Sequence, residues 1–94
     1  MKTRFKTTAT PRGHDWWSWS VRVDEPADKL SLIEHVEYIL HPTFPDRIRV
    51  ERNAANGFLL ESAGWGEFDI VANVTFKDRA SDDETVIVPL KLSP

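Results

Sequence analysis

Two short segments combine side chains that are suited to binding a flat, neutral group. They are His41-Pro42-Thr43-Phe44-Pro45 and Gly64-Trp65-Gly66. Aromatic faces stack on planar groups, so Phe44 and Trp65 would hold an amide between them if the two segments face each other. The Thr43 hydroxyl and the His41 ring can form hydrogen bonds, and glycine lets a ligand approach the backbone closely. Together the segments predict a small recognition site that is largely formed before its ligand arrives.

The two prolines of the first segment restrict its backbone, which lowers the entropy lost when a ligand binds there. Other interpretations of the same residues stay open at this point. Trp65 can be a core side chain in a bulged turn, Phe44 can cap one end of the fold, and His41 can bond to a neighbouring carbonyl. The tryptophans at 16, 17 and 19 are expected to belong to the core.

The sequence contains no recognisable reaction centre. Its three histidines, at positions 14, 35 and 41, do not have the spacing of metal ligands, and it has no cysteine, so we expect neither a metal nor a cofactor. The Gly64-Trp65-Gly66 segment is too short to cradle a phosphate and is not followed by Lys-Ser or Lys-Thr. A Gly-x-Ser-x-Gly nucleophile turn is also absent from the sequence. We therefore expect a protein that is not an enzyme.

The elements that must position these segments are short strands, because apolar and polar residues alternate repeatedly. The alternation is clearest in residues 17–23, 36–40, 68–76 and 86–92, and weaker in residues 4–9, 47–52 and 57–62. Pro89 lacks a backbone donor, so its strand is expected at a sheet edge or in a bulge. The Asn56-Gly57 pair predicts a tight turn that joins the strands on either side of it into a hairpin.

One region, residues 28–40, also fits the apolar period of a helix. Its β-branched and aromatic residues after Ile33 favour a strand, with a single helical turn beginning near Pro26. Six or seven short strands separated by polar turns predict an antiparallel β-sandwich. The length of 94 residues predicts one domain spanning residues 1–94, either a monomer or one domain of a larger protein.

The charge and composition of the chain exclude several partners. There are 12 basic and 15 acidic side chains, a net charge of −3, which argues against nucleic acid or an anionic membrane as the main partner. The absence of cysteine agrees with a reducing compartment. No apolar stretch is long enough to cross a membrane or to resemble a signal sequence. We therefore expect an intracellular, cytoplasmic location.

Four segments, taken in order, resemble the YEATS domain family. They are GHDWWSWSV, VEYILHPTFPDRIRV, GFLLESAGWGEFDIVANVTF and ETVIVPLKL, and together they cover residues 13 to 92. The combination of His-x-Thr-Phe-Pro with Gly-Trp-Gly-Glu-Phe is the specific part of the resemblance. Because the chain lacks long basic flanks, it looks most like the prokaryotic branch of the family.

The resemblance implies an immunoglobulin-like sandwich of about seven or eight strands. It also implies a reader of acylated lysine, such as acetyl- or crotonyl-lysine on a protein or peptide, or of a similar small acyl amide. In the family's pattern, Phe44 and Trp65 would form the two walls and Thr43 would supply the hydroxyl. The remaining positions are His41, which would support the loop and line the pocket, Gly64 and Gly66, which would open the backbone, and Phe68, which would close the floor.

The chain departs from the family at one place. Many members carry another aromatic residue just before the His-Asp-Trp element, where this chain has Arg12 and Gly13. The resemblance therefore does not extend to the additional wall that this aromatic residue provides in those members. The alternative to an acyl-lysine reader is a structural or protein–protein interaction sandwich without a working pocket, which would use the edge strand that contains Pro89.

Overall fold

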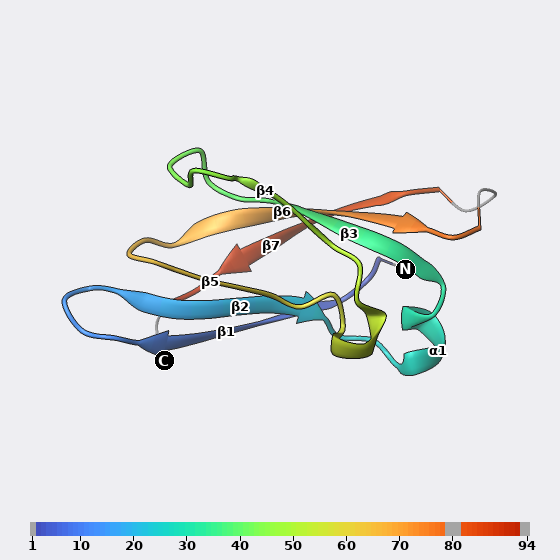
Figure 1. Ribbon diagram of the computed structural model, residues 1–94, viewed down its shortest axis with the longest axis horizontal. Coiled ribbons are helices and arrows are strands. Elements are labelled where there is room, and N and C mark those ends of the chain that lie inside the picture. The colour runs from blue at the N-terminus through green and yellow to red at the C-terminus, as the bar shows by residue number, and fades with distance from the viewer. Residues whose placement is uncertain (1, 79–81, 93–94) are drawn as a thin grey trace.

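The structure is a computed structural model that describes residues 2–78 and 82–92. These residues form two antiparallel sheets that face each other as the layers of a sandwich (Figure 1). The first sheet has the order β1-β2-β5 and the second has the order β4-β3-β6-β7. The strands are β1 (Phe5–Pro11), β2 (Trp17–Val23), β3 (Ile33–Ile39), β4 (Ile48–Glu51), β5 (Leu60–Gly64), β6 (Phe68–Phe76) and β7 (Glu84–Leu90). The predicted all-β, immunoglobulin-like sandwich is confirmed.

The core lies between the sheets and is built by the alternation seen in the sequence. In β2 the side chains of Trp19, Val21 and Val23 are buried, and the polar residues between them face outward. The same period of two buries Val36 and Tyr38 in β3. Because successive side chains of a strand point to opposite faces, each sheet presents one apolar face to the other.

The ambiguous region before β3 contains both a helical turn and a strand. Helix α1 (Ala27–Leu30) is one turn long and follows Pro26, and β3 begins at Ile33. Proline is well tolerated at the start of a helix because the N–H that it lacks would have no partner there. The prediction of one turn followed by a strand is therefore confirmed.

The predicted hairpin across Asn56-Gly57 is wrong. β4 pairs with β3 in the four-stranded sheet, and β5 pairs with β2 in the other sheet. Between β4 and β5 the chain forms the short 3-10 helix η1 (Ala54–Asn56) and then buries Phe58 completely. This segment, most of which is exposed, connects the two sheets, and Phe58 anchors it in the core that they share.

β7 lies at an edge of the four-stranded sheet, as the proline in its sequence predicted. The Tyr38 hydroxyl donates a hydrogen bond of 2.8 Å to the Phe58 carbonyl and so ties β3 to the crossing segment. None of the helices in the described part of the chain is long and apolar enough to cross a membrane.

Three loops meet at one end of the sandwich, namely β1–β2, β3–β4 and β5–β6 (Figure 1). The N-terminus and α1 lie at the opposite end, on the right of this view. The two segments singled out in the sequence belong to the β3–β4 loop and to the β5–β6 connection, so the fold brings them to the same end.

Candidate functional site

The β3–β4 loop is held in one shape by its backbone. The N–H of Phe44 donates to the His41 carbonyl at 3.0 Å, and the N–H of Leu40 donates to the Arg47 carbonyl at 2.7 Å. The first of these bonds closes a four-residue turn with Pro42 at its second position, where the restricted φ angle of proline is favourable. The loop therefore presents Phe44 in a defined orientation.

His41 and Thr43 form a small hydrogen-bonded unit within this loop. The backbone N–H of Thr43 donates to His41 Nδ1 at 3.2 Å, and the Thr43 hydroxyl oxygen lies 3.0 Å from the same nitrogen. In the His41 tautomer with its proton on Nε2, Nδ1 is the acceptor for both groups, and the Thr43 hydroxyl donates to it. The lone pairs of Thr43 Oγ1 then remain as acceptors for another group.

Aromatic rings pack beneath the loop and position Phe44. Its ring centroid lies 5.4 Å from that of Phe68 and 6.1 Å from that of Trp19. The ring centroids of Phe68 and His41 are 6.2 Å apart. Edge-on and tilted pairs at these separations are favourable for aromatic rings. Trp19 is buried, and within the described residues its indole N–H has no hydrogen-bond acceptor. This cluster joins the core to the floor of the site.

Trp65 stands out from the surface rather than filling the core. Its side chain is 70% exposed, which overturns the interpretation of Trp65 as a buried residue in a bulged turn. Beside it, a Cβ atom placed on Gly64 would lie 3.5 Å from Cζ of Phe44. The glycine therefore leaves open the space next to the Phe44 ring.

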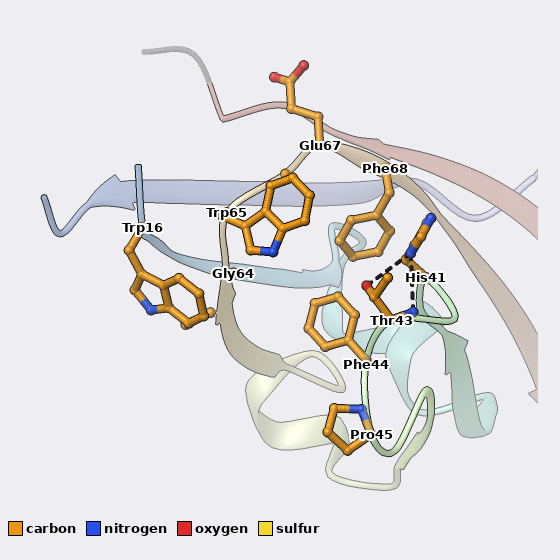
Figure 2. Close-up of a pocket in the computed structure, with 11 residues that line it drawn as sticks. Trp16, His41, Thr43, Phe44, Pro45, Gly64, Trp65, Glu67 and Phe68 are labelled. Atoms are coloured by element: carbon orange, nitrogen blue, oxygen red, sulfur yellow. Dashed lines mark hydrogen bonds between the residues drawn. The ribbon is translucent and has the colours of Figure 1, made fainter. Parts of the chain in front are cut away.

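The two loops enclose one open cavity of about 280 Å³. All seven predicted site residues line it, namely His41, Thr43, Phe44, Gly64, Trp65, Gly66 and Phe68. Figure 2 shows the Trp65 indole and the Phe44 ring across the cavity from each other, with Thr43 and His41 at one side. The arrangement can hold a planar group between two rings and offer it an acceptor oxygen.

The acidic residue of the β5–β6 connection points away from this cavity. Glu67 Oε2 accepts the backbone N–H of Leu92 at 2.7 Å, and Figure 2 shows its carboxylate directed outward. Within the described residues, no group of three His, Asp or Glu side chains is placed to hold a metal ion. The cavity walls are mainly apolar, so it is suited to a neutral group rather than to a cation.

Four further residues line the cavity, and sequence reasoning did not assign them to the site. They are Trp16, Pro45, Ala63 and Glu67. The placement of Trp16 in the core is wrong, because its side chain is 47% exposed and belongs to the β1–β2 loop. The alternation of side chains could have indicated this. Trp17 and Trp19 face inward, and Trp16 is offset from them by an odd number of residues.

The sequence matches a known protein family over a range that includes both the strands and the loops of the cavity. The family model described as the prokaryotic YEATS domain matches residues 17–84, well over half of the chain. The chain belongs to the YEATS domain family. The matched range of this YEATS domain includes the β3–β4 loop and the β5–β6 connection, and therefore most of the cavity.

Curated relatives of this YEATS domain are fungal proteins named "Protein AF-9 homolog". That of Eremothecium gossypii is 38% identical over 66 residues, which is 70% of this chain and 31% of the relative. That of Saccharomyces cerevisiae is 36% identical over 66 residues, which is 70% of this chain and 28% of the relative. The matched part thus spans less than a third of the length of these relatives.

Solved YEATS domains share the complete fold. The Yaf9 YEATS domain bound to H3K27ac superimposes with a TM-score of 0.79 at 26% identity, covering 100% of this chain and 78% of the other. The Yaf9 YEATS domain recognizing an H3K122suc peptide gives a TM-score of 0.72 at 25% identity, covering 98% of this chain and 78% of the other. Both structures are of the Yaf9 domain, bound to H3K27ac in the first and recognizing an H3K122suc peptide in the second.

Proposed function

We propose that this YEATS domain is a non-catalytic binding module that reads an acylated lysine, or a similar small acyl amide, in the slot between Phe44 and Trp65. The observation that carries the proposal is the pair of aromatic side chains on two loops that face each other across one open cavity. A planar amide offers both of its faces to such rings. The solved relatives that bind acylated histone peptides support the same class of ligand.

The hydrogen-bonding groups of the slot match the two polar atoms of an amide. With the His41 proton on Nε2, the Thr43 hydroxyl donates to Nδ1 and keeps its lone pairs, so Oγ1 would accept the amide N–H. The amide carbonyl needs a donor, and the backbone N–H groups around Trp65 and Gly66 would supply it. Acetyl- and crotonyl-lysine both carry this amide, and the ligand would be presented on a protein or peptide.

The exposure of Trp65 argues against a structural sandwich without a pocket. A side chain that is 70% exposed contributes little to the core, so a purely structural role does not explain a tryptophan at this position. The structural alternative predicts that replacing Trp65 changes no binding property. The binding module predicts the opposite result, with the fold unchanged.

Titration of the isotope-labelled domain with acetyl-lysine and crotonyl-lysine peptides, followed by heteronuclear NMR, tests the proposal. We expect signals of Thr43, Phe44, Trp65 and Gly66 to move, and we expect Trp65→Ala to abolish these shifts while the rest of the spectrum stays folded. Leu32→Ala, which alters a 59% exposed side chain beside α1, is the matched control and should bind normally. The proposal is wrong if millimolar peptide moves none of these signals in the wild-type domain.

A further inference from the structure

The outward face of the four-stranded sheet carries a row of apolar side chains that crosses all four strands. In the strand register, Ile48 of β4 pairs with Ile39 of β3, and Ile39 pairs with Val71 of β6. Val71 in turn pairs with Ile87 of β7. On β3, β6 and β7 these positions alternate with residues that face the core, so the apolar row points away from the core.

The two ends of the apolar row are open to solvent. Ile48 is 53% exposed and Ile87 is 55% exposed, and Val50, the next outward residue on β4, is 45% exposed. The outward face of the three-stranded sheet is different, because Thr8 of β1 and Ser20 of β2 pair there and form a hydrogen bond between their hydroxyl groups. An exposed apolar patch with a polar rim is typical of an interaction surface.

Acidic side chains flank the apolar row on both sides. On β3, Glu37 comes two residues before Ile39, and on β6, Asp69 comes two residues before Val71. Because these two strands are antiparallel, the two acidic positions lie on opposite sides of the row. Asn73 Nδ2 donates to Glu37 Oε1 at 3.1 Å and so restricts the position of that carboxylate. The surface therefore combines an apolar strip with a negative charge on each side of it.

The size and charge of this surface disfavour a second copy of the chain as its occupant. Three inter-strand spacings of about 4.8 Å give the apolar row a length of roughly 14 Å. A stable dimer buries about 800 Å² of each partner, which is far more than such a row presents. Packing two copies face to face would also bring the acidic sides of both rows together, in chains that each carry a net charge of −3.

A basic amphipathic helix fits the same surface better. Apolar side chains at positions i, i+3 or i+4, and i+7 of a helix span about 10 Å, which matches the length of the row. Lys or Arg side chains on both sides of that apolar stripe would reach Glu37 on one side and Asp69 on the other. Opposite charges placed in this way orient a partner and exclude partners of the wrong charge.

We propose that the apolar row is a docking surface for a basic amphipathic helix of a protein partner. Ile48 and Ile87 would contact the two ends of the helix's apolar stripe. Glu37 and Asp69 would pair with its basic side chains. None of these four residues lines the cavity between the loops, so this surface is separate from the acyl-lysine slot and does not depend on the function proposed for it.

Titration with two designed helical peptides of about 14 residues, long enough to cover the row, tests the proposal. Both peptides have the same leucine stripe, and they carry either Lys or Glu on both sides of it. In methyl NMR spectra of the full domain, we expect the Lys peptide to move the signals of Ile39, Ile48, Val71 and Ile87. The Glu peptide should bind at least about tenfold more weakly, because it meets the acidic rim. If the Lys peptide moves none of these signals, or if the two peptides bind equally, the proposal is wrong.

The double variant Ile48→Thr and Ile87→Thr removes both apolar ends of the row and keeps a β-branched side chain at each position. It should retain the thermal midpoint of the wild type, and it should bind the Lys peptide roughly 5- to 10-fold more weakly. Leu32→Thr changes another apolar side chain, 59% exposed and outside the row, and is the matched control that should bind as the wild type does.

The remaining outcomes also decide the question. The double variant Glu37→Gln and Asp69→Asn should lose most of the discrimination between the two peptides, and full discrimination in that variant would contradict the role of the acidic rim. Equal affinity of the threonine variant and the wild type would place the peptide elsewhere on the domain. A wild-type dimer in sedimentation velocity that the threonine variant fails to form would identify a second copy as the occupant and overturn the proposal.

Discussion

Gly64 lies beside both the buried Trp19 and the Phe44 ring of the slot. A substitution at this residue can therefore separate an effect on stability from an effect on ligand binding. A Cβ atom at Gly64 would lie 3.5 Å from Cζ of Phe44 and 3.9 Å from Nε1 of Trp19, which are ordinary contact distances. We therefore predict that Gly64→Ala folds with a thermal midpoint close to that of the wild type, but binds acyl-lysine peptides much more weakly. The added methyl group would fill the space beside Phe44 that the acyl amide needs. Thermal denaturation and peptide titration on the same sample check both statements.

Gly66→Ala is the matched control for this substitution. A Cβ atom at Gly66 would meet no atom within 4 Å, so its methyl group would not fill the space beside Phe44. We expect Gly66→Ala to reduce binding less than Gly64→Ala does. Equal losses in the two variants would indicate that glycine flexibility, rather than the open space beside Phe44, is what the site needs.

The Thr43 hydroxyl is the polar group whose contribution can be measured most directly. Thr43→Val keeps the shape of the side chain but removes the acceptor oxygen, so we predict a loss of about 1 kcal/mol, or about fivefold in Kd, for an acyl-lysine peptide. Thr43→Ser retains the hydroxyl and should bind almost as well as the wild type. Unchanged affinity for Thr43→Val would show that the amide N–H is bound elsewhere.

The sequence predicted the residues of the two-loop site, but it did not predict that Trp16 also lines the cavity. His41, Thr43 and Phe44 are adjacent in the chain, and their hydrogen-bonding and aromatic chemistry can be recognised from residue types alone. Trp16 was assigned to the core because a cluster of tryptophans usually is core. Its position depends on the backbone of the β1–β2 loop, and left-handed residues such as His14 and Asp15 give no clear signal in the sequence.

Among the elements, the segment between β4 and β5 is the one for which a short sequence pattern, Asn56-Gly57, gave a wrong strand pairing. Asn-Gly favours a two-residue hairpin turn, and here Gly57 does have a left-handed φ of 73°. The conformation was therefore predictable, but its consequence was not, because Phe58 is buried between the layers and takes the chain to the other sheet. Strand assignments succeeded because alternation reports burial directly, whereas strand partners depend on contacts that are distant in sequence.

The hydrogen bond between Tyr38 and Phe58 holds this crossing segment against β3. Phe58 has a left-handed φ of 57°, and burial raises the pKa of the Tyr38 phenol, with the nearby Glu51 carboxylate adding to the effect. The phenol is therefore a hydrogen-bond donor at all moderate pH values. We predict that Tyr38→Phe lowers the free energy of unfolding by about 1–3 kcal/mol, because the buried Phe58 carbonyl loses its donor. Urea denaturation measures this loss.

Tyr38→Phe removes one oxygen atom and leaves the ring in place, so changes in core packing should be small. Acyl-lysine binding should therefore persist in this variant, because Tyr38 does not line the cavity. An unfolding free energy equal to that of the wild type would mean that the Phe58 carbonyl finds another donor when the phenol is absent.

Considered as a whole, the molecule separates its binding end from the end that closes the sandwich. The first residues of the chain contact both sheets at the end opposite the cavity (Figure 1). Thr3 N–H donates to Glu84 of β7 at 3.0 Å, and Arg4 N–H donates at 2.9 Å to Glu25, which follows β2. Substitutions at this end should alter the stability of the domain without altering ligand affinity.

Glu25 makes this separation testable through pH. The Arg4 backbone N–H is the main cause that lowers the pKa of Glu25 below 4.5, and Lys29, whose ammonium lies 3.3 Å from the carboxylate, lowers it further against the effect of burial. A carboxyl group whose pKa is lower in the folded state than in the unfolded state stabilises the protein at pH values above its unfolded-state pKa. This contribution is lost as the pH falls through the folded-state pKa. We predict that Glu25→Gln lowers the thermal midpoint at pH 7, and that the difference from the wild type shrinks below about pH 4.5. Glu61→Gln, at an exposed position on β5, is the control, and a difference that stays constant from pH 7 to pH 3 would contradict the ionic role of Glu25.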